Sequence, residues 1–356
     1  MQEKLDAVAI LNKIAQERAS DLFIIAGLPL SYKVNGIIYS QGERLMPDAT
    51  EELIRQIYSL AAQRPIERFL NTGDDDFSFS IPGLSRFRVS AFKQRGSLAA
   101  VIRIIAFSLP DPVLLEIPEA VMSLASSSKG MILVTGPAGS GKSTTLACLI
   151  DRINETRSSH IITLEDPLEF LHRHKKSIVS QREIATDTKN YLSALRAALR
   201  QSPDVILLGE MRDFETIQTA MTAAETGHLI LSSLHTMGAA NTISRIIDVF
   251  EPNQQRQIAI QLSMVLKAVI SQQLIPDVDG RMIPAFEIMV MTPAISNMIR
   301  DNKVHQIEGM IYTSAKEDMI SMDNSLLNLY KAGRITKETA LKYCSNPEMM
   351  RRKVQI

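Results

Sequence analysis

The chain has 356 residues, which is long enough for two domains with separate hydrophobic cores. Its 39 basic and 39 acidic residues cancel, so no overall charge favours binding to nucleic acid or to an anionic membrane. The two cysteines, Cys148 and Cys344, form no C-x-x-C pair, which argues against a zinc module and against a disulfide framework.

The first residues carry no signal-peptide pattern, and no apolar run approaches the roughly 18 residues of a membrane-spanning helix. The sequence therefore predicts a cytoplasmic protein without direct membrane insertion. Such a protein can still dock on a membrane complex through a partner.

The N-terminal third predicts a small α+β domain over residues 1–105. Asn35 and Gly36 both tolerate positive φ, so they predict a two-residue hairpin turn. The expected elements are an amphipathic helix near 5–15, a strand at 21–25, hairpin arms at 32–34 and 37–39, a helix at 50–60, and strands at 77–81, 87–91 and 98–105.

Three prolines within residues 106–118 predict an interdomain linker. Beyond the linker, strands alternate with helices, which is typical of a mostly parallel sheet in an α/β P-loop domain over 119–356. The expected strands are 131–135, 161–164, 178–180, 205–208 and 229–232, with helices near 142–156, 187–201 and 213–226. From about 239 to 356 the pattern indicates a mainly helical region.

The run from Gly136 to Ser143 fits G-x-x-x-x-G-K-[ST] between an expected strand and an expected helix. In this pattern backbone N–H groups and the helix N-terminus face phosphates, Lys142 reaches the outer phosphates and Ser143 ligates Mg²⁺. The alternative is a glycine-rich turn without a ligand, but the strand–loop–helix context favours a nucleoside triphosphate. The predicted nucleotide-binding residues are Gly136, Pro137, Ala138, Gly139, Ser140, Gly141, Lys142, Ser143 and Thr144.

Two acidic clusters follow expected strands. Glu210 ends the run Val-Ile-Leu-Leu-Gly-Glu, and Glu165 ends a second strand. Ligands of open α/β sheets lie at the carboxyl ends of strands, so both acids are expected beside the phosphate loop. We assign Glu210 to the Mg²⁺ shell and Glu165 to polarising the attacking water, although these roles can be exchanged. The alternative for each is a solvated acidic turn.

His228 and His235 flank one expected strand, where they are placed to sense phosphate or to carry charge across a subunit joint. Together with residues 136–143, 163–169 and 200–213, the segment 226–236 closely resembles the secretion ATPases of type II secretion and type IV pilus systems. The four motifs occur in the family's order and spacing, and the resemblance extends over essentially the whole chain.

This resemblance implies a PAS-like N-terminal domain and a RecA-like ATPase domain assembled as a homohexamer that uses ATP and Mg²⁺. It also implies arginines that act on ATP across the cleft between the domains, with Arg86, Arg88 and Arg103 as the candidates. The alternative for these arginines is that they are solvent-exposed strand residues. Within the family the chain looks most like the retraction motors of twitching motility, which implies an inner-membrane pilus platform protein as partner.

Retraction motors carry the motif Ala-Ile-Arg-Asn-Leu-Ile-Arg-Glu, whereas this chain has Ala-Ile-Ser-Asn-Met-Ile-Arg-Asp at 294–301. The expected function is ATP-driven pilus retraction. A pilus-extension or secretion motor is the alternative, but those relatives usually carry a longer N-terminal region and often a four-cysteine zinc insert. A DNA translocase would want a basic channel, and no basic run is longer than the one within 350–353, so no nucleic-acid partner is expected.

Overall fold

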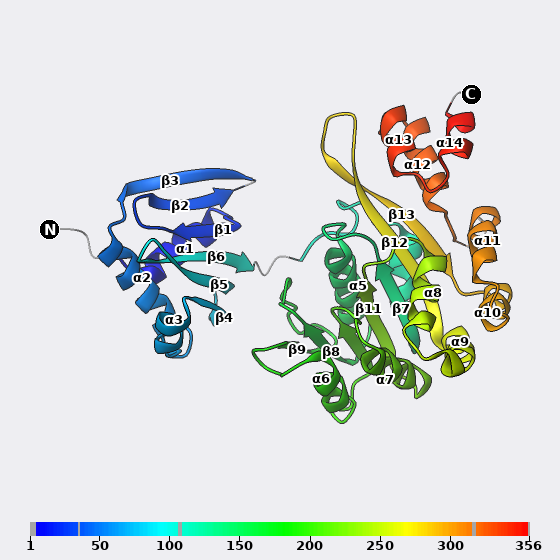
Figure 1. Cartoon of the computed structure of the whole chain (residues 1–356), viewed down its shortest axis with the longest axis horizontal. Coiled ribbons are helices and arrows are strands. Elements are labelled where there is room, and N and C mark those ends of the chain that lie inside the picture. Colours follow the sequence, from blue (N-terminus) through cyan, green and yellow to red (C-terminus); the bar gives the residue numbers. More distant parts are fainter. Residues whose placement is uncertain (1–4, 35, 106–108, 315–317, 355–356) are drawn as a thin grey trace. The chain divides into compact units, whose positions relative to one another are not determined.

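The structure is a computed structural model that describes residues 5–34, 36–105, 109–314 and 318–354. The chain forms two compact units, Met1–Ser108 and Leu109–Ile356, each built from helices and a sheet, which confirms the α/β class (Figure 1). Within the described residues, no helix is both long and apolar enough to cross a membrane.

The first unit is a six-stranded antiparallel sheet, as far as the described residues show, with strand order β3-β2-β1-β6-β5-β4. Its helices are α1 (Ala7–Gln16), α2 (Pro47–Leu60) and α3 (Glu67–Thr72). Its strands are β1 (Asp21–Ile24), β2 (Pro29–Val34), β3 (Ile37–Arg44), β4 (Asp74–Ile81), β5 (Ser85–Gln94) and β6 (Ser97–Ile105).

Side chains along β5 alternate between the covered face of the sheet and the opposite face. Phe87 and Val89 are buried in the core that α1 and α2 complete, because side chains of a strand point alternately to its two faces. Arg86 and Arg88 therefore lie on the opposite face. The structure has Val34 paired with Ile37, as a two-residue hairpin requires, while Asn35 lies outside the described residues.

The second unit contains a seven-stranded sheet within the described residues, with strand order β13-β12-β7-β11-β10-β8-β9 (Figure 1). All neighbouring strands are parallel except β12 and β13. The strands are β7 (Gly130–Thr135), β8 (His160–Glu165), β9 (Ile178–Glu183), β10 (Val205–Leu208), β11 (Leu229–Leu234), β12 (Leu266–Pro276) and β13 (Met282–Val290).

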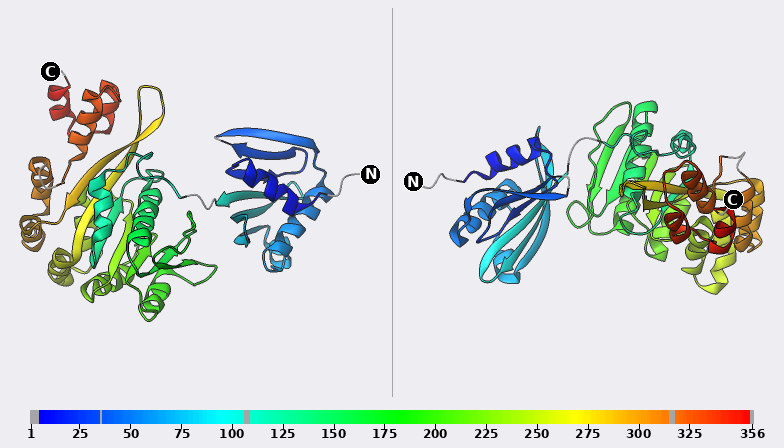
Figure 2. Two further views of the ribbon diagram at one scale, coloured as in Figure 1. Left: turned by 180° about the vertical axis from the view of Figure 1, so that it is seen from behind. Right: turned by 90° about the horizontal axis from the view of Figure 1, so that it is seen from above.

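Helices cover both faces of this sheet, as a parallel sheet requires (Figure 2). One face packs against α4 and α5, and the other against α6 to α9. The remaining helices extend the unit, and α12 to α14 pack on the outer half of the β12–β13 hairpin. The helices are α4 (Glu119–Met122), α5 (Lys142–Thr156), α6 (Tyr191–Ala198), α7 (Phe214–Glu225), α8 (Ala239–Asp248), α9 (Pro252–Val265), α10 (Pro293–Arg300), α11 (Ile307–Thr313), α12 (Met322–Lys331), α13 (Lys337–Tyr343) and α14 (Pro347–Lys353).

The expectation of a mainly helical region from about 239 onward is wrong for β12 and β13, which together form the longest pairing in this sheet. The helix α9 ends at Val265 and β12 begins at Leu266, with no glycine or proline between them to mark the boundary. Three polar residues also interrupt the apolar run of β12. Its strand character depends on pairing with β7, which lies far away in the sequence.

Candidate active site

The phosphate loop connects β7 to α5, and its glycines adopt backbone conformations that other residues rarely take. Gly136, Gly139 and Gly141 have φ of 141°, 74° and 86°. The helix α5 starts at Lys142 directly after this loop, so its unpaired N-terminal N–H groups face the same space. The sequence prediction of this loop and of helix 142–156 agrees with the geometry.

Lys142 is held against the loop from which it arises. Its ammonium donates hydrogen bonds to the carbonyl oxygens of Gly136 at 3.0 Å and Pro137 at 2.8 Å. Burial lowers the pKa of Lys142, and the carboxylates of Glu169 and Glu210 oppose that shift. The cation thus sits in a partly dehydrated site, where its attraction to an anion is stronger than in water.

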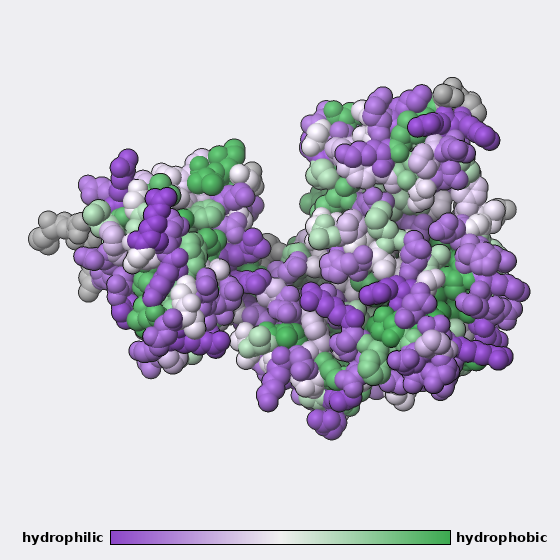
Figure 3. Space-filling model, viewed as in Figure 1, coloured by the Kyte–Doolittle hydropathy of each residue, from purple (hydrophilic) through white to green (hydrophobic). Residues whose placement is uncertain are grey.

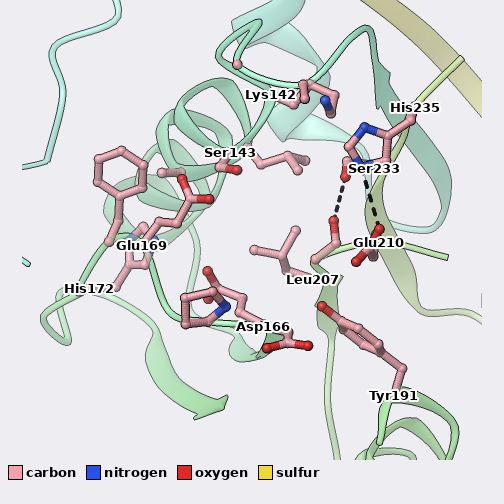
Figure 4. Close-up of a pocket in the computed structure, with 18 residues that line it drawn as sticks. Lys142, Ser143, Asp166, Glu169, His172, Tyr191, Leu207, Glu210, Ser233 and His235 are labelled. Carbon is pink, nitrogen blue, oxygen red and sulfur yellow. Dashed lines mark hydrogen bonds and ion pairs between the residues drawn. The ribbon is translucent and has the colours of Figure 1, made fainter. Parts of the chain in front are cut away.

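A pocket opens beside the loop and is lined by residues from the carboxyl ends of three strands (Figure 4). Glu165 comes from β8, Glu210 follows β10, and His235 follows β11. Parallel strands end at the same sheet edge, and the β10–β8 ladder continues because the Gly209 N–H donates to the Leu164 carbonyl at 2.8 Å. The predicted acids therefore lie together at this pocket.

Glu210 contacts two basic side chains. Its Oε1 lies 2.7 Å from Nη2 of Arg212, and its Oε2 lies 3.6 Å from Nε2 of His235. The atom Oε2 is buried and has no hydrogen-bond partner among the described residues. A buried carboxylate oxygen without a donor is unfavourable, which makes it a candidate ligand for a cation.

Glu165 has a different electrostatic environment. Burial raises its pKa to about 7, although a long hydrogen bond from Gln181 Nε2, at 3.5 Å, favours the charged form. A carboxyl group with a pKa near neutrality exchanges protons readily at physiological pH, as a general base must. The environments of Glu165 and Glu210 therefore separate the two acids chemically.

One predicted site residue of the second unit lies away from this pocket. His228 lies at the opposite end of β11, where its Nδ1 is 2.9 Å from the carbonyl oxygen of Ala223, and it does not line the pocket. Arg86, Arg88 and Arg103 belong to the first unit. There Arg88 lies opposite Arg103 in the β5–β6 ladder, and Nε of Arg103 is 3.1 Å from Oδ1 of Asp21.

Two contacts of the site were not anticipated from the sequence: an ion pair of Glu210 beside the pocket, and a tyrosine in the pocket lining. Arg212 lies only two positions beyond Glu210, but its ion pair depends on the turn after β10. Tyr191 begins α6, and its hydroxyl would lie 2.8 Å from a Cβ on residue 209, so a larger residue there would require Tyr191 to move. Burial raises the pKa of Tyr191, and the neighbouring Glu210 adds to the shift. No motif signals either contact.

A phosphate loop at the end of a parallel sheet, faced by two chemically distinct acids and a histidine, defines a P-loop ATPase. Residues 3–289 match the family model for type II/IV secretion system proteins. The chain belongs to this family.

Three relatives illustrate the similarity. The chain is 43% identical over 347 residues to the type IV pilus retraction ATPase PilT of Pseudomonas aeruginosa, covering 97% of this chain and 99% of that relative. It is 45% identical over 303 residues to a twitching motility protein of Neisseria gonorrhoeae, covering 85% and 81%. A crystal structure of the pilus retraction motor PilT with bound ADP superposes with a TM-score of 0.89 at 44% identity, covering 98% of this chain and 99% of that one.

We predict separable effects for the two acids. Glu165→Gln is expected to bind nucleotide with near-normal affinity and to lose turnover, because the amide cannot accept the proton of water. In the wild type, kcat/KM is expected to rise as pH increases through about 7, because a pKa raised to about 7 keeps Glu165 protonated below it. Glu210→Gln is expected, in addition, to weaken the dependence of ATP turnover on Mg²⁺.

Steady-state ATPase assays across pH and Mg²⁺ concentration, with Kd from a fluorescent nucleotide, distinguish these effects. Normal hydrolysis by Glu165→Gln would remove this residue from the mechanism.

Proposed function

We propose that this chain is the ATP-hydrolysing motor that powers type IV pilus retraction, working as a hexamer at the cytoplasmic face of the inner-membrane pilus machine. The observation that carries the ATPase part is the convergence of Lys142, Glu165, Glu210 and His235 on one pocket. The retraction part is supported by the near-complete mutual coverage with a retraction ATPase.

The roles at the site follow from its electrostatics. The loop N–H groups, the α5 N-terminus and Lys142 bind the phosphates. Glu165 orients and deprotonates the attacking water, because its pKa is near neutrality. His235 contacts Glu210 and so links that acid to the segment that leads into α8.

The residues also fit Mg²⁺, which prefers oxygen ligands and keeps several waters and phosphate oxygens in its shell. Ser143 and Glu210 line the pocket with a hydroxyl and a carboxylate, and Oε2 of Glu210 is buried without a donor. These two residues would hold the ion, which when bound neutralises phosphate charge.

Arg86, Arg88 and Arg103 are proposed to supply positive charge to the nucleotide from the first unit. Arg88 and Arg103 are adjacent like charges on one strand pair, an arrangement that is unfavourable without acids nearby. Asp21 and Asp76 line the same hollow and offset this repulsion. His228, on the edge opposite the pocket, is proposed to act at a subunit joint.

The alternative is a motor for pilus extension or secretion. A DNA translocase is less well supported, because the chain has no net charge. Salt-dependent DNA binding by the purified protein would favour the translocase.

Light scattering tests whether the protein forms a ring. About six subunits are expected with ATP bound, and a fully active monomer would contradict this proposal.

The ATPase proposal predicts that Lys142→Ala abolishes ATP turnover and leaves the fold intact. The change removes the ammonium that opposes the negative phosphates, together with its two hydrogen bonds to the loop carbonyls of Gly136 and Pro137. Phosphate release and circular dichroism of the purified variant measure the two effects. Turnover within a few-fold of wild type would refute the phosphate-loop assignment.

Helix α10 is proposed to contact the membrane platform protein. Ile295 and Ile299 are buried in the core, as expected for residues on one face of the helix, whereas Ala294 and Arg300 are exposed. Ser296, which replaces the arginine of retraction motors, donates a hydrogen bond from its hydroxyl to the carbonyl oxygen of Ser263 at 3.0 Å. Arg300 donates a long hydrogen bond to the Ser296 hydroxyl at 3.4 Å and is otherwise exposed to a partner.

We predict that Arg300→Ala retains ATP hydrolysis and loses retraction, so that cells become over-piliated and stop twitching. As an exposed residue, Arg300 should contribute less than about 0.5 kcal/mol to folding stability. Pilus counts, twitching zones and ATPase rates measure the outcome. Normal twitching in this variant would show that Arg300 on α10 does not couple ATP hydrolysis to retraction.

A further inference from the structure

Three consecutive polar residues lie buried in the middle of β12. Ser271, Gln272 and Gln273 are only 2%, 4% and 7% exposed. Buried polar side chains are destabilising unless they form hydrogen bonds, so each of these residues needs a specific partner. The three partners belong to three different parts of the unit.

Gln272 faces the phosphate loop. Its Oε1 accepts a hydrogen bond from the Thr145 hydroxyl at 2.7 Å, across the boundary between β12 and α5. Its own backbone carbonyl would lie 2.2 Å from a Cβ on residue 136, and its Nε2 would lie 2.8 Å from a Cβ on residue 141. Gln272 therefore contacts both ends of the loop and the first turn of the helix behind it.

The neighbours of Gln272 connect to other segments. The Ser271 hydroxyl oxygen accepts from the Gly238 N–H at 2.9 Å, just beyond His235. On the other side, Nε2 of Gln273 donates to the Tyr343 carbonyl at 3.5 Å, at the end of α13. Among the described residues, neither side chain forms a hydrogen bond with the loop, so the role of Gln272 is separable from theirs.

We propose that Gln272 is a positioning residue for the nucleotide: it fixes the phosphate loop and the start of α5 through Thr145. The loop's N–H groups bind phosphate only if the chain from residue 136 to 145 keeps its curvature. The backbone of Gln272 sets the position of one end of that curve, and its side chain sets the other. The inference rests on the proposed phosphate-binding role of residues 136–143.

The direct test replaces each partner of the hydrogen bond. Gln272→Leu removes the acceptor at similar volume, and Thr145→Val removes the donor at nearly the same shape. Either change is expected to raise the Kd for ADP and the KM for ATP about tenfold, the effect of losing a buried hydrogen bond that orders a binding site. The kcat is expected to change less than about threefold, because the acids of the pocket are untouched.

Two matched variants serve as controls. Gln273→Leu removes a buried amide from the next position of β12 and is expected to lower Tm without changing the Kd for ADP. Thr145→Ser keeps the hydroxyl and is expected to bind ADP within about twofold of wild type. If Gln272→Leu does not fold, the comparison of Thr145→Val with Thr145→Ser still tests the hydrogen bond.

Isothermal titration with ADP and steady-state kinetics on the full chain decide the outcome. Wild-type ADP affinity in Thr145→Val, or an equal loss in Gln273→Leu, would overturn the proposal. Lys142→Ala distinguishes a failure of the phosphate-loop assignment from a failure of the proposed role of Gln272. If it binds ADP normally, the phosphate-loop assignment itself is wrong. If it loses binding while Thr145→Val does not, only the role of Gln272 is wrong.

Discussion

The parallel pairing of β7 with β12 is the contact on which the active site depends. It places the Gln272 carbonyl where a side chain on residue 136 would have to be, so the first loop residue must be glycine for steric as well as conformational reasons. Since the loop starts at that point, its path toward Lys142 follows from how β12 is packed. The β12–β13 hairpin is in turn covered by the C-terminal helices α12 to α14. The surface in Figure 3 is mostly polar over these helices, and the apolar residues that join them to the hairpin are buried beneath it.

The second constraint is the common edge at which parallel strands end. It brings together Glu165, Glu210 and His235 from strands that are separated by dozens of residues in the sequence. Their environments then differ because Glu210 has a cationic partner in Arg212, whereas burial dominates at Glu165. One sheet edge thus supplies both a carboxylate suited to a cation and a carboxyl group suited to proton transfer.

Local sequence signals predicted most of the second unit. The P-loop pattern located the start of α5 at Lys142, because glycine conformations and the helix N-terminus are encoded within a few residues. The strands β12 and β13 were missed because their stability comes from pairing with each other and with β7, and residues such as Glu287 and Met289 also occur readily in helices.

The same distinction applies to the site. Glu165 and Glu210 were predictable, since a strand followed by an acid is a local pattern. Tyr191 and Gln272 were not, because their contacts with Gly209 and Gly136 join segments that are far apart in the sequence. His228 was expected at the site from its place beside a strand. It precedes β11, however, whereas the pocket lies where β11 ends, so the length of the strand separates His228 from the pocket.

ATP hydrolysis by this chain is expected to remove pili from the cell surface. The most direct measurement deletes the gene in its host, counts surface pili by electron microscopy, and repeats the count after complementation with wild type or Glu165→Gln. Over-piliated, non-twitching cells that only the wild-type gene restores would support a retraction motor. Bald cells after deletion would contradict it and identify an extension motor.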